Sequence, residues 1–341
     1  MKNLINILLI YTGGTIGMIK DSETGALKAF NFEKLLERIP ELKLLDCNID
    51  VESFERPIDS SDMTTIYYKK IVNIIASNYD KYEGFVVLTG SDTMAYTSSA
   101  LSFMLENLSK PVIFTGSQLP IGDLRTDAKE NLITAIQIAS SYENNKPVVP
   151  EVALYFEYQL YRANRTTKIN AEHFEAFTSI NYPPLATSGV HLKFTKEAIL
   201  PYVAQELIVN THLSSDVVIL KLFPGISENT VKSILNINNI KAVILETYGS
   251  GNAPTAKWFL NLLKETIKRG VFIINVSQCA GGSVYMGKYE TSLQLKKLGV
   301  IDGKDITTES ALAKGMYLLG ARKGLKSFKR RFETSLRGEI S

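Results

Sequence analysis

The chain has 341 residues, of which 45% are hydrophobic and 21% are charged, and its mean hydropathy is close to zero. This composition is typical of a globular protein, and the length predicts two domains. A formal net charge of +3 is too small to make nucleic acid the expected partner, and no apolar stretch approaches the ~20 residues that span a bilayer. Two lone cysteines fit a reducing compartment, so we expect a cytoplasmic protein that binds neither nucleic acid nor a membrane.

Short apolar runs alternate with helical patterns through the first half of the chain. Most of these runs are continuously apolar, which is typical of strands buried on both faces of a parallel sheet. The first run lacks a small-residue cleavage site and leads directly into a Gly-rich turn, which favours a strand over a signal peptide. The predicted strands are Ile5–Tyr11, Ile49–Phe54, Phe85–Thr89, Val112–Thr115 and Val152–Phe156.

Two helices are predicted between these strands. Asp62 is expected to cap a helix that runs to about Ser77, and Thr126 or Asp127 is expected to cap another. The alternation of strands and helices predicts a doubly wound α/β domain. The expected inner-face residues are Ile66, Ile71, Ile74 and Ile75 in the first helix, and Leu132, Ile136 and Ala139 in the second.

A second set of strands follows residue 215, and a helix is expected to start at Pro254. Residues 193–215 show little periodicity, so we predict an N-terminal domain of residues 1–192, a linker of residues 193–215 and a C-terminal domain of residues 216–341. The second set of strands is Val217–Leu220, Ala242–Leu245 and Phe272–Val276.

The C-terminal stretch 322–333 is basic, which invites a nucleic-acid interpretation. Apolar residues recur there at three- and four-residue spacing, so an amphipathic helix with a solvated basic face is favoured instead. The apolar residues of this predicted helix are Leu325, Phe328, Phe332 and Leu336.

Hydroxyl, carboxylate and amine groups gather just after the carboxyl ends of the predicted strands. In open α/β sheets, ligands bind at that edge, near the point where the strand order reverses. Five polar loops therefore predict one site at the edge of the first sheet. They are residues 12–17, 59–62, 90–93, 116–118 and 162–168.

Several kinds of chemistry are disfavoured at this edge. The glycines around Thr15 do not fit G-x-G-x-x-G, and no Walker A loop is present. The histidines His173, His191 and His212 form no ligand-like cluster, so no metal site is expected. A Ser-His-Asp triad lacks both a suitable histidine and a G-x-S-x-G elbow. The remaining option is a hydroxyl nucleophile assisted by Lys, Asp or Tyr.

Several motifs carry a resemblance to a known family. Residues 11–18 (YTGGTIGM) resemble the first signature of bacterial-type asparaginases, and residues 90–96 (GSDTMAY) resemble the second. Residues 100–118 are similar to the cytoplasmic type I branch, and residues 160–168 and 248–254 extend the match into both halves. The resemblance implies two flavodoxin-like doubly wound domains, the N-terminal one larger and the C-terminal one smaller. It also implies hydrolysis of L-asparagine to L-aspartate and ammonia by a homodimer or homotetramer, without a metal or organic cofactor.

The resemblance also implies residue roles. Thr15 would attack the amide carbon to give an acyl-enzyme, and Ser91, Asp92 and Lys168 would form a second triad across the substrate. Because burial favours a neutral lysine and the neighbouring carboxylate favours a charged one, the sequence leaves the charge of Lys168 open. The implied substrate-binding residues are Asp59, Ser60, Ser91, Asp92, Ser117 and, from the neighbouring subunit, Asn252.

Three positions depart from the family pattern. Ser91 replaces the usual threonine, which weakens rotamer restriction and predicts slower turnover. The loop of residues 23–28 lacks the tyrosine that assists the nucleophile in many members, so Tyr289 is our candidate to substitute for it as a catalytic residue. Glu246 stands where some type I enzymes use an arginine to bind effector asparagine, so we predict no such activation.

Rival interpretations remain at this point. A glutaminase would use the same chemistry, and one methylene discriminates by only ~1–3 kcal/mol, so the preference for asparagine over glutamine stays open. The amidotransferase subunit acting on glutamyl-tRNA usually carries an extra N-terminal domain, which the start of this chain disfavours. A non-catalytic amino-acid sensor would lack Thr15 or Lys168, and both are present. Arg125, Asp127 and Asn131 match the family and are expected to fix the loop before a helix.

Overall fold

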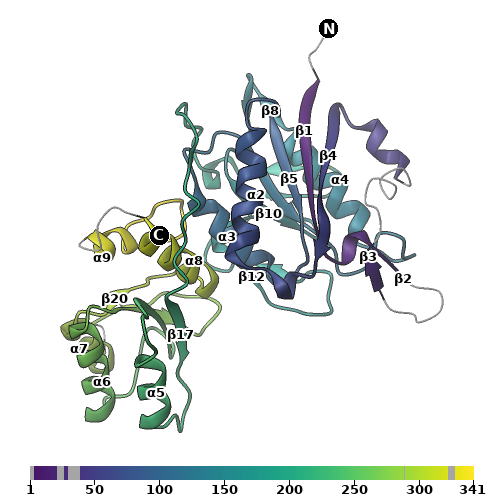
Figure 1. The fold of residues 1–341 in the computed structure, drawn as a ribbon. Helices are drawn as coiled ribbons and strands as arrows, with labels where there is room; N and C mark the ends of the chain where they lie inside the picture. Colours follow the sequence, from purple (N-terminus) through teal and green to yellow (C-terminus); the bar gives the residue numbers. More distant parts are fainter. Residues whose placement is uncertain (1–3, 21–26, 30–38, 288, 322–326) are drawn as a thin grey trace. The chain divides into compact units, whose positions relative to one another are not determined.

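The structure, a computed structural model, describes residues 4–20, 27–29, 39–287, 289–321 and 327–341. The chain divides into two compact units, Met1–Thr211 and His212–Ser341 (Figure 1). Each unit has its own sheet with helices packed on it, which confirms the predicted α/β class with a larger first and a smaller second domain. Parts of the predicted linker pair with strands of the first unit, namely β15 (Lys193–Phe194) and β16 (Ile208–Val209), and the linker itself stays a prediction.

The first unit is built on an eight-stranded sheet in the order β15-β14-β11-β10-β7-β5-β1-β4. Its five parallel strands, numbered along the chain, lie in the order 2-1-3-4-5, which is the flavodoxin order. The strand order reverses between β1 and β5, so a ligand crevice is expected beyond their carboxyl ends. The five strands are β1 (Ile5–Gly13), β4 (Cys47–Ile58), β5 (Gly84–Leu88), β7 (Val112–Thr115) and β10 (Val152–Phe156).

These strands confirm the first-half predictions within a few residues at their ends. β5, β7 and β10 are buried along their whole length, as continuous apolar runs predict. β4 is the outermost strand and, of its twelve residues, only Phe54 is buried. Antiparallel strands extend the opposite edge, namely β11 (Gln159–Arg162), β14 (Ala186–Thr187) and β15.

Helices cover both faces of this sheet (Figure 1). α4 (Ala128–Ala139) packs on the face that carries Leu9 and Val86, and α2 (Thr65–Ser77) and α3 (Met94–Met104) cover the other face.

The start of α2 differs from the sequence-based prediction. The residue before the helix is Thr64, which makes no side-chain capping bond, and Asp62 belongs to a separate turn of 3₁₀ helix, η3 (Ser60–Asp62). Ile66 was expected on the inner face, but it lies in the first turn of the helix and is 75% exposed. The remaining predicted inner-face residues, Ile71, Ile74 and Ile75, are buried.

The second unit is a four-stranded parallel sheet in the order β17-β18-β19-β20. Val243 and Leu245 pack in one core with α5 and α6, whereas Ile244 approaches Gly315 of α8, so helices cover both faces here as well. The three predicted strands are confirmed, and the helix expected from Pro254 begins at Lys257. The elements are β17 (Val217–Lys221), β18 (Ala242–Thr247), β19 (Phe272–Ser277), β20 (Ile301–Asp302), α5 (Glu228–Leu235), α6 (Lys257–Lys268), α7 (Glu290–Leu298) and α8 (Thr308–Gly320).

The predicted C-terminal amphipathic helix is wrong in its length. α9 (Phe328–Phe332) has five residues and buries both of its phenylalanines, but the chain leaves the helix before Leu336. The carboxylate of Glu339 accepts hydrogen bonds from the backbone N–H groups of Leu336 and Arg337, which stabilises a turn in place of further helix. Leu325 lies outside the described residues.

Short elements connect the larger ones. Within the described part of the chain, none of the helices combines the length and the hydropathy needed to span a bilayer. The short elements are η1 (Thr15–Gly17), β2 (Met18–Lys20), β3 (Leu27–Ala29), η2 (Pro40–Leu44), β6 (Leu105–Glu106), β8 (Tyr142–Glu143), β9 (Lys146–Pro147), η4 (Ala163–Arg165), β12 (Thr167–Lys168), β13 (Phe177–Thr178) and η5 (Lys196–Ala198).

Candidate active site

Three of the predicted site loops lie close together at the carboxyl ends of β1, β4 and β5, and glycines permit this close approach. A Cβ atom on Gly14 would clash with the backbone of Gly90, and one on Gly90 would clash with the hydroxyl of Ser60. A Cβ atom on Gly13 would likewise clash with the backbone of Ile58. The backbone therefore approaches here more closely than any side chain allows. The loops after these three strands form one continuous surface.

Thr15 lies on this surface because it directly follows Gly14. It opens η1, and its side chain is half-buried. A Cβ atom on Gly17, at the end of the same turn, would clash with the ring of Tyr11, so this glycine lets the turn sit over the buried tyrosine. The hydroxyl of residue 15 is thus carried on a short turn supported by the core of the first unit.

Lys168 contacts both of its predicted partners. Its Nζ donates to Ser91 Oγ at 2.8 Å and to Asp92 Oδ1 at 2.7 Å. The lysine side chain is 15% exposed, whereas that of Asp92 is 69% exposed. β12, which carries Lys168, pairs with β13 and holds the amine beside the loop that follows β5. The sheltered amine of Lys168 therefore joins the hydroxyl of Ser91 to the exposed carboxylate of Asp92.

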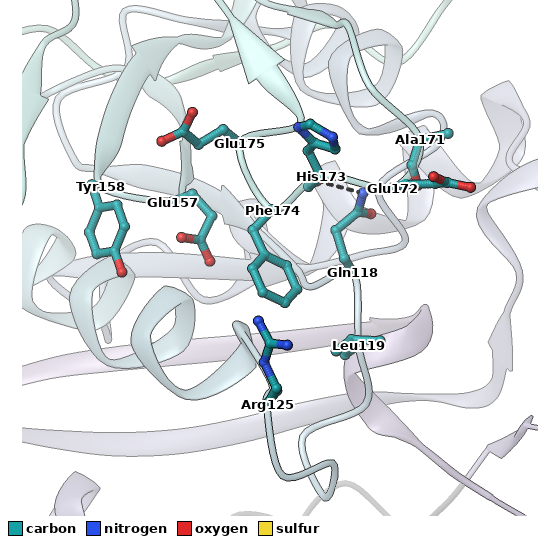
Figure 2. Close-up of a pocket in the computed structure, with 10 residues that line it drawn as sticks. All are labelled: Gln118, Leu119, Arg125, Glu157, Tyr158, Ala171, Glu172, His173, Phe174 and Glu175. Atoms are coloured by element: carbon teal, nitrogen blue, oxygen red, sulfur yellow. Dashed lines mark hydrogen bonds between the residues drawn. The ribbon is translucent and has the colours of Figure 1, made fainter.

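Gln118 is the fourth member of this cluster, and the sequence analysis assigned it no role. Ser91 Oγ donates to Gln118 Oε1 at 3.1 Å. Gln118 Nε2 donates to the carbonyl oxygens of Ala171 and His173 at 3.1 and 3.0 Å, and Figure 2 shows Gln118 beside the loop that carries these two residues. A flipped amide would place Oε1 against two carbonyl oxygens, so the orientation of the amide is determined by its partners. Ser91 must then donate to Gln118 and accept from Lys168.

Asp59 and Ser60 lie at the end of β4. The carboxylate of Asp59 accepts hydrogen bonds from the backbone N–H and the hydroxyl of Ser61 at 2.8 and 2.7 Å. These two bonds lower the pKa of Asp59, so this carboxyl group is ionised at neutral pH. Thr93 Oγ1 donates to the carbonyl oxygen of Ser60 at 2.7 Å, which ties the loop after β5 to the loop after β4.

Ser117 is 2% exposed, and its hydroxyl donates to the carbonyl oxygen of Leu119 at 2.6 Å. The same loop is held from α4. Asp127 accepts from the backbone N–H groups of Gln118 and Leu119, and Asn131 Nδ2 donates to the carbonyl oxygen of Gly116 at 3.0 Å. Asp127 and Asn131 therefore fix this loop, as predicted.

The other predicted site residues belong to the second unit, and their roles stay predictions. Asn252 Oδ1 accepts from Thr291 Oγ1 at 2.7 Å, and Tyr289 lies at the start of α7 with 48% of its surface exposed. Glu246 is buried and accepts from Thr308 Oγ1 at 2.6 Å, and it pairs with Lys221 at 3.1 Å. In the loop of residues 23–28, residues 23–26 lie outside the described residues.

Comparison with known families identifies the family of the chain. A family model described as "Asparaginase, N-terminal" matches residues 6–200, and one described as "Glutaminase/Asparaginase C-terminal domain" matches residues 216–332. The chain belongs to the asparaginase family. It is therefore an enzyme, a hydrolase of that family.

Two L-asparaginases resemble the chain over their full length, and a lysophospholipase resembles it over part of its length. L-asparaginase 1 of Escherichia coli (strain K12) is 41% identical over 337 residues, and the match covers 98% of each chain. The crystal structure of L-asparaginase I from Vibrio cholerae O1 biovar eltor str. N16961 has a TM-score of 0.91 and 40% identity, covering 99% of each chain. The 60 kDa lysophospholipase of Mus musculus is 39% identical, with 98% of this chain and 62% of that protein covered. These matches confirm the predicted resemblance to the type I asparaginases.

Proposed function

We propose that the chain is an L-asparaginase that hydrolyses L-asparagine to L-aspartate and ammonia, with Thr15 as the nucleophile. The observation that carries this proposal is the contact of Lys168 with Ser91 and Asp92 at the sheet edge that also bears Thr15. A threonine hydroxyl is a weak nucleophile at neutral pH unless a neighbouring group takes its proton. A polar cluster with an amine, a carboxylate and a second hydroxyl supplies the groups that such a reaction needs.

The acids of the site suit a zwitterionic substrate. Asp59 is ionised, and the carboxylate of Asp92 is open to solvent, so both can accept hydrogen bonds from the α-ammonium group of asparagine. The hydroxyl of Ser60 and the backbone around Ser117 line the rest of the binding site in this proposal. The hydroxyl of Ser91, which Lys168 holds in place, orients the side-chain amide of the bound asparagine in this proposal.

The reaction proceeds in two balanced steps. The oxygen of Thr15 forms a bond to the amide carbon and gives up its proton, and the amide nitrogen leaves as ammonia after taking a proton. Water then attacks the resulting ester, which releases aspartate and returns the proton to the threonine oxygen. Backbone N–H groups of the Gly-rich turn stabilise the oxyanion, which is worth roughly 10²–10³ in rate per donor.

The proposal also includes an assembly. We propose a cytoplasmic homodimer or homotetramer in which Asn252 of a neighbouring subunit completes the substrate site. Glu246 is held by Lys221 and Thr308 and carries the wrong charge for the carboxylate of an effector. We therefore expect a hyperbolic dependence of rate on asparagine, and a sigmoidal curve would contradict this part of the proposal.

The test is ammonia release from asparagine and from glutamine by the purified chain. We expect Thr15→Ala to lower kcat by about 10³-fold or more, because no other group can form the ester. Thr15→Ser is the matched control, since it keeps the nucleophilic oxygen and should retain measurable turnover. Wild-type rates in Thr15→Ala, or no release of ammonia from either amide by the wild type, would contradict the proposal.

Tyr289 is proposed to assist the nucleophile, and the same assay tests it. Tyr289→Phe should lower kcat sharply, because only the hydroxyl is lost. Tyr285→Phe is a comparable exposed tyrosine of the second unit and serves as the control. Equal rates in the wild type and in Tyr289→Phe would remove this residue from the mechanism.

A further inference from the structure

A pocket lies in the first unit, beyond Gln118. It has a volume of 840 Å³ and is bounded by the loop after β7, by the turn between β10 and β11, and by residues 171–175, which follow Lys168 (Figure 2). This volume is in the range of pockets that hold small molecules. Gln118 lines the pocket and also accepts the hydrogen bond of Ser91, so the pocket adjoins the candidate active site.

Glu157 is the unusual group of this pocket. The residue is 8% exposed, and none of the described residues donates a hydrogen bond to its carboxylate or forms an ion pair with it. Its backbone N–H donates to Asn131 Oδ1 at 3.0 Å, so the main chain is fixed while the side chain is left without a partner. Figure 2 shows the carboxylate directed into the space between the rings of Tyr158 and Phe174. A carboxylate that faces a pocket without a protein partner is available to a ligand there.

Glu157 and Tyr158 form the two-residue turn between β10 and β11. Both have positive φ angles, +40° and +67°, as is usual for the central residues of a two-residue hairpin turn. Asn131 and the pairing of β10 with β11 hold this turn. With only 8% of its surface exposed, Glu157 lies against the protein, where it lines the pocket.

The electrostatic surroundings of Glu157 are negative. Burial and, to a lesser extent, the neighbouring carboxylates of Asp127, Glu130 and Glu175 together raise the pKa of Glu157 to about 7. Arg125 and His173 also line the pocket, but neither is bonded to Glu157. A positive group in the pocket would relieve both the desolvation of Glu157 and its repulsion by the other acids.

We propose that this pocket binds the primary ammonium group of a small amine, with Glu157 as the anchoring carboxylate. Glu175 at the rim contributes a second negative charge, and the rings of Tyr158 and Phe174 contact the aliphatic part of the ligand and the face of its cation. The compact ammonium group fits a single inward carboxylate better than a planar guanidinium does, because the guanidinium favours two parallel bonds. This site is separate from the proposed hydrolysis of asparagine and does not depend on it.

The test is calorimetric titration of the full chain with putrescine, a four-carbon diamine, at about pH 8, where Glu157 is ionised. We expect saturable binding in the millimolar range, and we expect the neutral analogue butanediol not to bind. Glu157→Gln should weaken putrescine binding at least tenfold. Glu197→Gln, which removes an exposed carboxylate of the same unit outside the pocket, should leave it unchanged. No saturable binding, or equal affinity in the wild type and in Glu157→Gln, would overturn the proposal.

Two further arms keep the result unambiguous. Asp92→Asn removes a carboxylate of the candidate active site. If this variant loses putrescine binding while Glu157→Gln keeps it, the diamine binds in the candidate active site and the proposal is overturned. If Glu157→Gln does not fold, the wild type decides alone. Binding should weaken severalfold between about pH 8 and pH 5.5, because the carboxylate must lose its proton to bind a cation. Equal affinity at both values would exclude Glu157 as the anchor.

Discussion

Two lysine–carboxylate pairs in this chain share the same chemistry and differ in their surroundings. Lys168 and Asp92 in the first unit form an ion pair of 2.7 Å in which the carboxylate is 69% exposed. Lys314 and Glu339 in the second unit form a pair in which neither side chain has any exposure. Lys314 also donates to the carbonyl oxygens of Phe332 and Thr334 at 2.6 and 2.8 Å, so all three of its N–H groups are used.

The two pairs differ in whether their charged groups remain accessible to a ligand. Glu339 accepts from two backbone N–H groups as well as from Lys314, so the buried pair is satisfied within the protein and fastens the C-terminal segment to α8. Lys168 has two acceptors among the described residues, and one of them is a serine hydroxyl. The Lys168–Asp92 pair, here called the open pair, has an exposed carboxylate and a serine hydroxyl on the same amine, and both can contact a ligand. The Lys314–Glu339 pair, here called the closed pair, is fully buried and serves only to stabilise the fold.

The largest effect should come from breaking the open pair. Lys168→Met keeps the apolar part of the side chain but removes the amine. We expect kcat to fall by about 10³-fold or more, since Ser91 and Asp92 lose their common partner. Because Asp92 is exposed and can be solvated, the free energy of unfolding should change by less than about 1 kcal/mol. Ammonia release and denaturant unfolding, measured on the same preparation, check both parts.

Breaking the closed pair should give the reverse result. Lys314→Met leaves Glu339 buried without its counter-charge, which typically costs about 3–5 kcal/mol of stability. The folded fraction should keep its kcat, because the pair lies in the second unit and contacts none of the proposed catalytic groups. Denaturant unfolding with a steady-state assay at low denaturant measures both quantities. A stable Lys314→Met variant, or a large loss of kcat in the folded protein, would contradict the distinction between the two pairs.

The sequence predicted the strands and the convergence of the site loops well, because both depend on local patterns. Continuous apolar runs determine buried parallel strands, and polar residues after such strands must meet at one edge of the sheet. Element ends were less predictable. Asp62 entered a separate turn and Ile66 turned outward, because the contacts of neighbouring loops decide where a helix begins.

The contacts that define the site in detail could not be read from the sequence. Gln118 was visible in a motif, but its bonds to Ser91 and to the carbonyl oxygens of two residues after Lys168 join three separate loops. Glu157 gave no signal because a glutamate in a polar turn is normally solvated, and only its 8% exposure in the folded chain shows that it is buried against the protein. Such features depend on tertiary geometry and have no periodicity.

The smallest effect on kcat should come from changing the residues that direct the Ser91 hydroxyl beside Lys168. Serine has no γ-methyl group, so its hydroxyl relies on Gln118 and Lys168 for its direction, whereas a threonine at this position would be restricted by its own branching. We expect Gln118→Met to lower kcat about tenfold, or about 1.4 kcal/mol, with little change in KM. Ser91→Thr alone should raise kcat a few-fold.

The double variant provides the decisive measurement. If Gln118 acts by directing the hydroxyl of Ser91, then Gln118→Met should cost only about two- to threefold in kcat when residue 91 is threonine, giving a coupling energy of roughly 0.5–1 kcal/mol. A merely structural role of Gln118, through the carbonyl oxygens of Ala171 and His173, would lower kcat equally in both backgrounds. Additive effects in this cycle would therefore show that the open lysine pair does not need Gln118 to aim its hydroxyl.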